Sequence, residues 1–214
     1  MDARRLTIVA VLLAACYVVL GLAVSPAPPG RLDVAAEALR GHGVPAALFF
    51  TRAGQFPVYA GVCVLLLIAG AFRRAWLGRV GLAVATLLGA WVSSDLGKAF
   101  FHRPRPAGWI GIHETSSSYA SGHATLSLAF YGFWACCMWT SGASPAARTA
   151  APAALCALIV AIGWSRLALG AHYATDVLGG YLLGGAWLCL ALAVRSRLAV
   201  RSRLAARPAS FAGR

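Results

Sequence analysis

The chain has 214 residues, of which 60% are apolar and only 12% are charged, and its mean hydropathy is +0.73. A soluble domain would be about 45–50% apolar and about 25% charged, so the composition excludes a disordered or collagen-like chain and indicates a membrane protein. The formal net charge of +13 does not indicate a nucleic-acid-binding protein, because the basic residues flank apolar runs and form no stripe along an amphipathic face.

Six apolar stretches follow one another along the chain, at residues 6–24, 56–72, 80–97, 124–140, 150–164 and 177–194. With their flanks they reach the roughly 17–25 residues that a membrane-spanning helix needs. The first stretch is longer than the apolar core of a signal peptide, which has about 7–15 residues, so we expect it to be retained as a span. In the fifth stretch we expect Pro152 in the first helical turn, where proline is tolerated.

The predicted fold class is therefore all-α, a polytopic membrane protein with six transmembrane helices. We expect residues 1–195 to form a single six-span domain and residues 196–214 to form a basic cytoplasmic tail. The cysteines lie inside apolar runs, where they behave as small hydrophobic residues, so we expect neither a disulfide framework nor a zinc site. They are Cys16, Cys63, Cys136, Cys137, Cys156 and Cys189.

Lysine and arginine are distributed unevenly between the two sides of the membrane that six spans define. The side that carries both termini holds twelve: Arg4, Arg5, Arg73, Arg74, Arg79, Arg148, Arg195, Arg197, Arg201, Arg203, Arg207 and Arg214. The opposite side holds seven: Arg31, Arg40, Arg52, Lys98, Arg103, Arg105 and Arg166. The positive-inside rule then predicts a multi-pass protein of the inner (plasma) membrane, with both termini in the cytoplasm and the first, third and fifth loops outside.

The first loop, residues 25–55, begins with a cluster of proline and glycine residues that breaks regular structure. After this cluster we expect Asp33 to cap a short helix that continues to Leu39. Apolar residues such as Val34 on this helix suggest that it lies on the outer membrane face.

Polar and ionisable residues gather at the outer ends of the spans. Because placing an ionisable side chain in or beside a membrane span costs free energy, we expect these residues to have a function. The third loop carries Lys98 and Arg105, the start of the fourth span carries Ser121, Gly122 and His123, and the fifth loop carries Arg166, His172 and Asp176. Because the three groups lie on the same predicted face of the membrane, we expect them to form one site.

The cations in this set suit an anion with several oxygens. Lys98, Arg105 and Arg166 can converge on such a group, and the planar fork of arginine matches a phosphate. Ser121 and Gly122 precede the fourth span, where a hydroxyl and free backbone N–H groups at a helix N-terminus can also bind an anion.

The two histidines and the aspartate supply the groups that a phosphoryl transfer needs. Asp176 follows His172 by four residues, so on a helix the two share a face. A carboxylate there can hold Nδ1–H and leave Nε2 free to attack, while His123 protonates the leaving oxygen. Phosphoryl transfer needs mainly positioning and neutralisation of the oxygen charges. The cations can provide this, so we expect no metal and no other cofactor.

Three spaced motifs in the chain, Lys98-x6-Arg105-Pro106, Ser121-Gly122-His123 and Ser165-Arg166-x5-His172-x3-Asp176, resemble the signature motifs of the type 2 phosphatidic acid phosphatase (PAP2) superfamily. The motif region covers residues 98–176. The resemblance implies a PAP2-like helical core, metal-independent hydrolysis of lipid phosphates or diphosphates, and a phosphohistidine intermediate.

The resemblance also implies a role for each motif residue. His172 would be the nucleophile, Asp176 its partner and His123 the general acid. The phosphoryl group would be held by Lys98, Arg105, Ser121, Gly122 and Arg166. The chain departs from the family pattern at Ala120, where the middle motif usually has proline, and this departure puts the rigidity of the loop in doubt more than the activity.

Several polar residues near these motifs have other expected roles. Arg103 is interpreted as either a headgroup contact or an anchor, and Asp95 is expected to be a buried partner of Lys98 or of a nearby arginine. His102 and Glu114 are loop residues near the site whose roles the sequence leaves open.

The sixth span contains Gly180-x3-Gly184, which permits close helix contact. We expect this pair of glycines to serve packing within the chain rather than a dimer contact.

The leading hypothesis is an integral-membrane lipid phosphatase that acts at the outer leaflet on undecaprenyl diphosphate, phosphatidic acid, phosphatidylglycerol phosphate, a lipid A phosphate or a similar lipid. The alternative is a non-catalytic protein of the same fold that binds or flips lipid phosphates, although a binder needs cations and no nucleophile. A vanadate-dependent haloperoxidase is similar at the anion site, but such enzymes are soluble. The expected partners are the lipid substrate and the bilayer, with no nucleic acid, and the oligomeric state is left open.

Overall fold

The computed structural model describes residues 2–72, 76–111 and 115–205, and within these ranges the chain forms helices and loops but no strand. The elements are α1 (Ala3–Val24), α2 (Arg31–Ala36), the 3-10 helix η1 (Glu37–Leu39), α3 (Val44–Ala53), α4 (Phe56–Phe72), α5 (Leu77–Phe101), α6 (Gly122–Trp139), α7 (Pro145–Ala168) and α8 (Ala174–Ala205). Each of the six predicted apolar stretches coincides with one long helix, which confirms the all-α membrane fold.

The long helices differ in how they satisfy the requirements of a membrane span. Helices α1, α5, α7 and α8 are each long and apolar enough to cross a membrane, and the pair α3 and α4, bent by 48°, would provide a fifth crossing. Helix α6 is not among them. Its polar residues, such as Thr125 and Ser127, make it less apolar than the other long helices, and they are buried inside the protein. The first loop thus contains a second helix, α3, that the sequence analysis did not predict.

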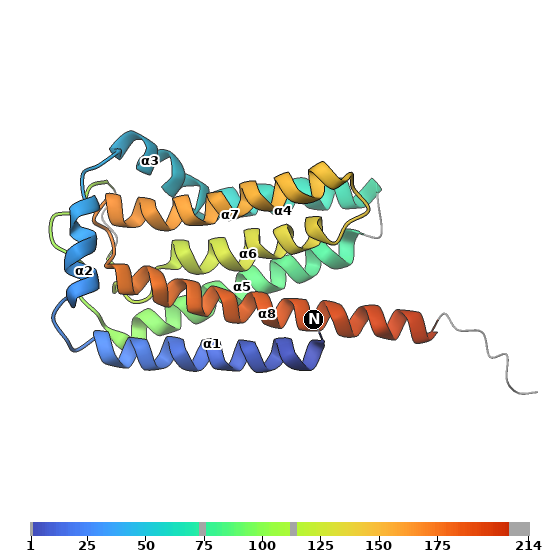
Figure 1. Cartoon of the computed structure of the whole chain (residues 1–214), viewed down its shortest axis with the longest axis horizontal. Helices are drawn as coiled ribbons and strands as arrows, with labels where there is room; N and C mark the ends of the chain where they lie inside the picture. Colours follow the sequence, from blue (N-terminus) through green and yellow to red (C-terminus); the bar gives the residue numbers. More distant parts are fainter. Residues whose placement is uncertain (1, 73–75, 112–114, 206–214) are drawn as a thin grey trace, which may run out of the picture.

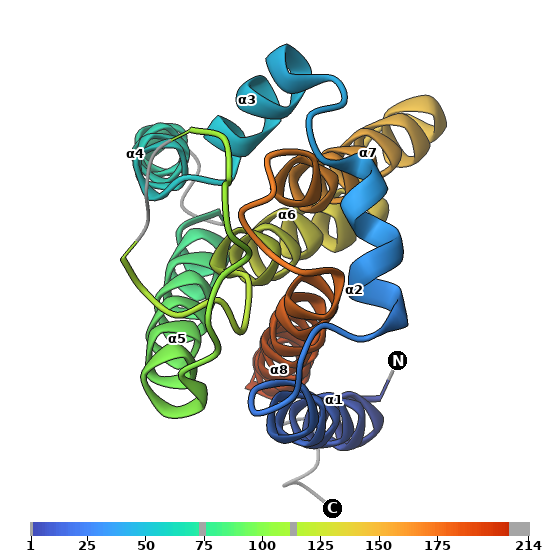
Figure 2. The same cartoon turned by 90° about the vertical axis from the view of Figure 1, so that its left-hand side faces the viewer.

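The long helices run side by side, and the short helix α2 stands across one end of the bundle (Figure 1). Figure 2 looks onto that end and shows α6 near the centre, between α5, α7 and α8. Helix α1 packs on the outside of α8. The α5–α6 and α7–α8 connections both lie at the end covered by α2, so the three sequence motifs meet there (Figure 2).

Each outer helix buries one narrow stripe of residues against the bundle. The residues on its other faces are mostly apolar and exposed. On α1 the buried residues are Leu6, Ala10, Tyr17 and Gly21, whose spacing of four, seven and four residues places them on one helix face. Residues on the other faces, such as Val19, are exposed. An exposed surface of this kind is stable only where lipid replaces water.

The glycines Gly180 and Gly184 of α8 lie against α6, as expected for packing within the chain. A Cβ atom on Gly180 would lie 2.6 Å from the Ser121 carbonyl oxygen, and one on Gly184 would lie 2.5 Å from the Thr125 carbonyl oxygen. Only glycine allows the two backbones to come this close.

Two expectations about helix starts are wrong. Helix α7 begins at Pro145 and not near residue 150, since Ser144 caps it by accepting a hydrogen bond from the Ala147 N–H, so Pro152 lies inside the helix. Helix α2 begins after Gly30, and Asp33 is its third residue instead of its cap. The Asp33 side chain is buried and has partners in other elements, described below.

Candidate active site

All eight predicted site residues lie at the end of the bundle that α2 covers. Lys98 is in the last turn of α5, Arg105 in the α5–α6 loop, Ser121, Gly122 and His123 at the start of α6, Arg166 in the last turn of α7, His172 in the α7–α8 loop and Asp176 in the first turn of α8. Because α6 and α8 both begin here, the positive ends of two helix dipoles point to the same region.

The predicted nucleophile and its carboxylate partner are in contact. His172 Nδ1 lies 3.5 Å from Asp176 Oδ2, and both side chains are almost fully buried. His172 stands two residues before α8 begins, because Gly170 ends α7 with a φ of +63° and reverses the chain. The pairing that sequence spacing predicts is thus made by a loop residue and a helix residue.

The opposite ring nitrogen of His172 faces a cation. Nε2 lies 3.2 Å from Arg105 Nη1, and a guanidinium can only donate hydrogen bonds. Nε2 is therefore the acceptor and Nδ1 carries the proton, on the side of Asp176. In this tautomer the Nε2 lone pair is directed at Arg105 Nη1, so an anion that took over this hydrogen bond from Arg105 would lie against Nε2.

The surroundings keep the His172 imidazole neutral. Burial lowers the pKa of His172 from its ordinary 6.5 to about 4, Asp176 opposes this change, and Arg166 and Arg105 add to it. A neutral imidazole at physiological pH has an available lone pair, which is the form that a nucleophile requires.

Two of the predicted cations converge on one hydroxyl group. The Lys98 Nζ and the Arg105 Nη2 atoms each donate a hydrogen bond of 3.2 Å to Ser116 Oγ. Arg105 is further held by the Ser116 carbonyl oxygen at 2.7 Å and the Ala171 carbonyl oxygen at 3.0 Å. An anion that replaced the Ser116 hydroxyl would contact both cations at once.

The N-terminus of α6 adjoins the same cations. A Cβ atom on Gly122 would lie 3.8 Å from Lys98 Nζ, so the absence of a side chain leaves the backbone open to an anion beside the ammonium. Ser121 is the residue before the first turn of α6, where its side chain makes no capping hydrogen bond, and it is fully buried.

The other two predicted residues are held by α3, which the sequence analysis did not anticipate. Arg166 is buried and its Nη1 donates a hydrogen bond of 2.6 Å to Thr51 Oγ1. The His123 ring packs against Gly54, where a Cβ atom would lie 2.7 Å from His123 Cδ2. The bend between α3 and α4 therefore brings Thr51 and Gly54 to the site.

The loop that departs from the family pattern is firmly attached. Ala120 is fully buried, the Tyr119 hydroxyl donates a 2.6 Å hydrogen bond to the Tyr17 carbonyl oxygen, and the Ser121 N–H donates to the Asp176 carbonyl oxygen at 3.0 Å. These contacts position the loop without a proline at residue 120.

The sequence analysis did not assign Arg103 to the site, yet Arg103 contacts the carboxylate of Asp176, the predicted partner of His172. Its side chain is 2% exposed, so it is neither a membrane anchor nor a headgroup contact. Its Nη1 donates to Asp176 Oδ1 at 2.6 Å, and its Nη2 donates to Asp33 Oδ2 at 2.8 Å. The chain has only six acidic residues, and this scarcity is the one sequence signal that could have drawn attention to Asp33.

The remaining polar residues lie outside this network or outside the described ranges. Asp95 is exposed on α5 and is not the buried partner that we expected, because its helix face points away from the bundle with Val92 and Leu96. His102 is exposed and ends α5. Glu114, like the basic residues 73, 74, 207 and 214, falls outside the described residues.

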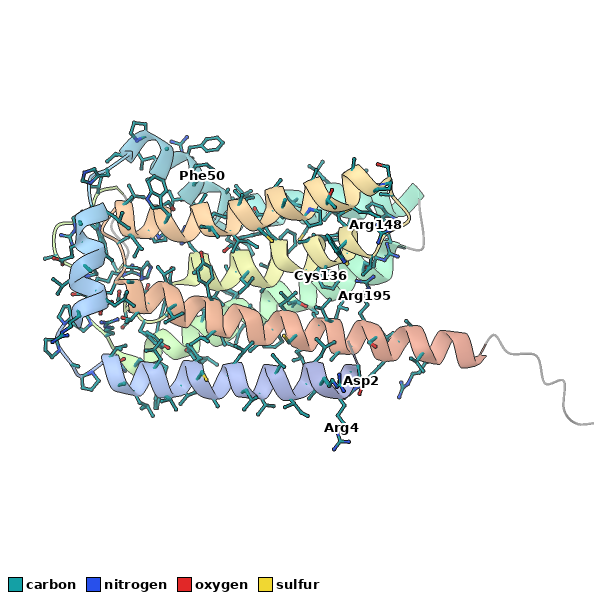
Figure 3. All side chains as sticks on the ribbon, viewed as in Figure 1. Asp2, Arg4, Phe50, Cys136, Arg148 and Arg195 are labelled. Atoms are coloured by element: carbon teal, nitrogen blue, oxygen red, sulfur yellow. The ribbon has the colours of Figure 1, made fainter. Side chains whose placement is uncertain are left out.

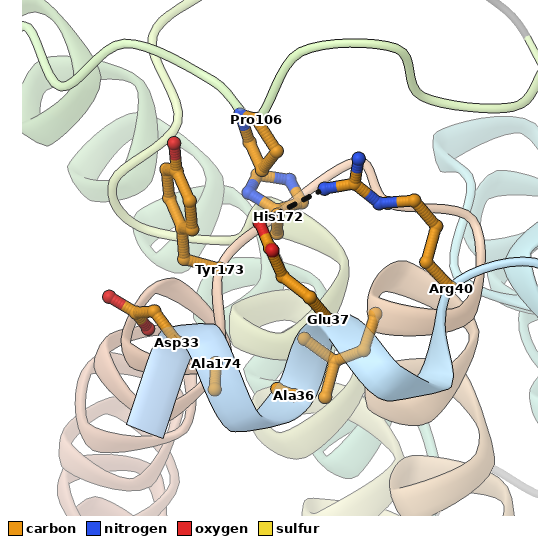
Figure 4. Close-up of a pocket in the computed structure, with 10 residues that line it drawn as sticks. Asp33, Ala36, Glu37, Arg40, Pro106, His172, Tyr173 and Ala174 are labelled. Carbon is orange, nitrogen blue, oxygen red and sulfur yellow. Dashed lines mark hydrogen bonds and ion pairs between the residues drawn. The ribbon is translucent and has the colours of Figure 1, made fainter. Parts of the chain in front are cut away.

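A small cavity of about 10 Å³ lies between α2 and His172, which is room for at most one water molecule. Figure 4 shows Asp33, Glu37 and Arg40 on the α2 and η1 side of it, facing Pro106, His172 and Tyr173. This cavity is too small for a phosphate and lies in the wall of the site.

Among the described residues, no three His, Cys, Asp or Glu side chains gather as a metal site would require. The cations described above are the groups available to neutralise an anion. Metal independence itself stays a prediction and is tested below.

A family model named PAP2 superfamily matches residues 78–199, which is more than half of the chain. The chain belongs to the PAP2 superfamily. All eight predicted site residues lie within the matched segment of this PAP2 protein.

Two solved structures share the fold. The chain is similar to a transmembrane PAP2-type phosphatidylglycerolphosphate phosphatase from Bacillus subtilis, with a TM-score of 0.75, 21% identity, and coverage of 88% of this chain and 96% of that chain. It is also similar to LpxE from Aquifex aeolicus, with a TM-score of 0.56, 21% identity, and coverage of 78% and 96%.

One curated relative is similar in sequence. An uncharacterized 22.5 kDa protein in the cps region of Klebsiella pneumoniae is 38% identical over 93 residues, which are 42% of this chain and 43% of that protein. The match thus spans less than half the length of that relative.

Proposed function

We propose that this PAP2 protein is a membrane lipid phosphatase that hydrolyses a phosphomonoester or diphosphate through a phosphohistidine on His172. The observation that carries the proposal is the placement of the His172 ring, with Nε2 at 3.2 Å from Arg105 Nη1 and Nδ1 facing Asp176 Oδ2 at 3.5 Å. The arrangement supports the proposal because a neutral imidazole would have, at one nitrogen, a cation able to bind phosphate and, at the other, a carboxylate able to stabilise the positive charge that the ring gains on attack.

The reaction follows from these positions in two steps. The Nε2 lone pair attacks phosphorus, and the bond from phosphorus to the leaving oxygen breaks, which is the lipid oxygen of a monoester or the bridging oxygen of a diphosphate. His123 donates a proton to that oxygen. His123 then takes a proton from water, which attacks phosphorus, and the P–N bond breaks to release inorganic phosphate and neutral His172. Lys98, Arg105 and Arg166 neutralise the oxygen charges in both steps.

The alternative is a non-catalytic protein that binds or flips lipid phosphates. Its cation set would be the same, but binding alone has no use for a fully buried carboxylate behind a buried, neutral imidazole. Burying a charged carboxylate lowers the stability of the folded protein unless its partners compensate. A role in hydrolysis gives a reason for this arrangement, whereas binding alone does not.

The substrate lies within the class of membrane lipid phosphates. Phosphatidylglycerol phosphate is the substrate named for the similar Bacillus subtilis protein, and undecaprenyl diphosphate, phosphatidic acid and a lipid A phosphate share the phosphate group that the site would recognise. A site at the outer face and little extra-membrane sequence fit an undecaprenyl-type diphosphate.

The test is phosphate release from each of these four lipids by the purified protein, with His172→Ala as the inactive control. We expect release that persists in EDTA, and inhibition by vanadate, whose trigonal bipyramidal form resembles the phosphoryl transition state. Loss of activity in EDTA that magnesium restores would contradict metal independence. Tight binding of all four lipids without release would support the non-catalytic alternative.

We also propose that the site faces outward and that both termini are cytoplasmic. The N-terminal end of α1 and the C-terminal part of α8 lie at the end of the bundle away from α2 (Figure 1). Figure 3 shows Arg4, Arg148 and Arg195 gathered toward that same end, in agreement with the positive-inside rule.

A reporter fused to the C-terminus of the full chain tests this orientation. A reporter that works only in the cytoplasm should be active there, whereas one that works only outside the cell should be inactive. The reverse result would overturn the orientation and place the site on the cytoplasmic side.

A further inference from the structure

Two residues that none of the three motifs specifies, Asp33 and Arg103, form a buried ion network with the Asp176 carboxylate. Arg103 lies between two aspartates, with Nη2 at 2.8 Å from Asp33 Oδ2 and Nη1 at 2.6 Å from Asp176 Oδ1. The exposed fractions of these three side chains are only 2%, 1% and 0% for Arg103, Asp33 and Asp176. Burial at this level makes an ion pair costly to build, so the network calls for an explanation beyond surface solubility.

We propose that Asp33 and Arg103 are positioning residues that fix the Asp176 carboxylate and set the charge around His172. This inference rests on the proposed function, in which His172 is the nucleophile. Neither Asp33 nor Arg103 needs to touch the substrate, and both would act through Asp176.

The contacts of Asp176 support the positioning role. Its Oδ2 atom accepts hydrogen bonds from Ser118 Oγ and from the Tyr173 N–H at 2.9 Å, and it faces His172 Nδ1. Its Oδ1 atom accepts from Arg103 Nη1. A carboxylate held at one oxygen can still rotate, so the Arg103 contact at the second oxygen fixes the plane in which Oδ2 meets His172.

Arg103 is itself held in one place. Its guanidinium lies 4.4 Å from the centre of the Tyr173 ring, within cation–π distance, and Nη1 also donates to Thr175 Oγ1 at 2.6 Å. The Arg103 carbonyl oxygen accepts from the Ser118 N–H at 2.8 Å. Through these contacts Arg103 joins the α5–α6 loop to the first turn of α8.

Asp33 brings the short helix α2 into the same assembly. Its Oδ1 atom accepts hydrogen bonds from the Thr175 N–H at 2.9 Å and the Thr175 hydroxyl at 2.8 Å. Because Thr175 is in the first turn of α8, Asp33 satisfies an N–H that has no partner within that helix. The aspartate that sequence analysis expected to cap its own helix therefore caps α8 instead.

The charges explain why two carboxylates flank one arginine. Arg103 alone would cancel the charge of Asp176 and weaken its support for the imidazolium that forms when Nε2 bonds to phosphorus. With Asp33 the triad carries a net charge of −1, which complements the single positive charge that the phosphohistidine ring acquires.

The test uses the pH dependence of kcat/KM, whose acidic limb reports protonation of the free enzyme. The charged or titratable groups at this end of the bundle are Asp176 from α8, Arg166 from α7, Arg105 and Arg103 from the α5–α6 loop, Lys98 from α5, His123 from α6, and Asp33, Glu37 and Arg40 from α2 and the residues that follow it. Removing the negative charge of Asp33 and removing the positive charge of Arg103 should shift the acidic limb of the pH profile in opposite directions, because they change the ease of protonating His172 in opposite senses.

Asp33→Asn removes a negative charge but keeps an oxygen that can accept from Thr175. It should make protonation of His172 harder and shift the acidic limb to lower pH. Arg103→Gln removes a positive charge and should shift the limb to higher pH. Both should lower kcat by about 10–100-fold, the scale known for hydrogen-bond partners that orient a metal-binding histidine or carboxylate, with a smaller change in KM.

Two further variants separate charge from geometry. Arg103→Lys keeps the charge but has one ammonium in place of the fork, so kcat should fall while the acidic limb stays near its wild-type position. Glu37→Gln removes a carboxylate from the neighbouring turn whose side chain is 51% exposed, and solvent screening should leave both kcat and the limb nearly unchanged.

Opposite shifts of the limb for Asp33→Asn and Arg103→Gln would support the proposal. Limbs that stay in place or move in the same direction, with wild-type kcat, would show that the network only holds α2 in place and would overturn it. If Arg103→Gln fails to fold, Asp33→Asn and Arg103→Lys still decide the matter. Activity that persists in His172→Ala would instead contradict the proposed function, so the two failures are distinguishable.

Discussion

Replacing His172 with alanine should abolish phosphate release, because this change removes the atom that bonds to phosphorus. Replacing His123 with alanine should cost about 10²–10⁴-fold, which is the usual contribution of a general acid. The cost at His123 should be smaller for substrates with good leaving groups, such as a diphosphate or an aryl phosphate, because their leaving oxygens need less protonation.

The intermediate distinguishes the two histidines directly. In a rapid-quench experiment with labelled substrate, the wild-type protein should give an acid-labile, base-stable phosphoenzyme. His172→Ala should give none, whereas His123→Ala should still form it from a substrate with a good leaving group. His42→Ala provides a matched control, since His42 is an exposed loop residue and its loss should change neither activity nor labelling. Labelling that survives in His172→Ala but disappears in His123→Ala would reverse the two roles.

The sequence was sufficient to predict the six long helices because an apolar run of this length has few stable alternatives in a membrane. It also predicted which motifs meet, because the ends of successive spans on one side must lie at the same face of the bilayer. The contact between His172 and Asp176 agrees with the prediction, although His172 lies just outside the helix.

The roles of Asp33 and Arg103 could not be predicted in the same way. These residues are separated by 70 positions, and their contact depends on how α2 lies across the bundle, which no periodicity in a six-residue helix reveals. Asp95 was instead assigned a buried role that it does not have. Its position three residues before Lys98 does not determine which face of α5 packs against the neighbouring helices. The start of α7, in contrast, could have been predicted, because serine followed by proline is typical of a helix N-terminus. The sequence analysis placed the start near residue 150 because the apolar run begins there.

Replacing Gly180 with alanine should impair both stability and activity. A Cβ atom there would lie 2.6 Å from the Ser121 carbonyl oxygen and 2.8 Å from the Ala124 Cβ atom. Since these are backbone and near-backbone atoms, α6 must move away from α8. The movement would carry Ser121 and Gly122 away from His172, and a displacement of about 1 Å can cost about 10²-fold in rate. Overpacking of this kind costs about 1–3 kcal/mol of stability, which a thermal unfolding measurement in detergent would detect.

Two glycine variants serve as controls for this experiment. Gly184→Ala meets the Thr125 carbonyl oxygen at 2.5 Å, one turn further from the site, so it should destabilise the protein similarly but reduce activity less. Gly81→Ala in α5 has no neighbouring atom within 4 Å and should be neutral or stabilising by about 0.4–1 kcal/mol. If Gly180→Ala is as stable and as active as the wild type, then α6 and α8 do not pack as closely as this contact requires, and the N-terminus of α6 is not held by α8. The anion site would then have to be positioned by the α5–α6 loop alone.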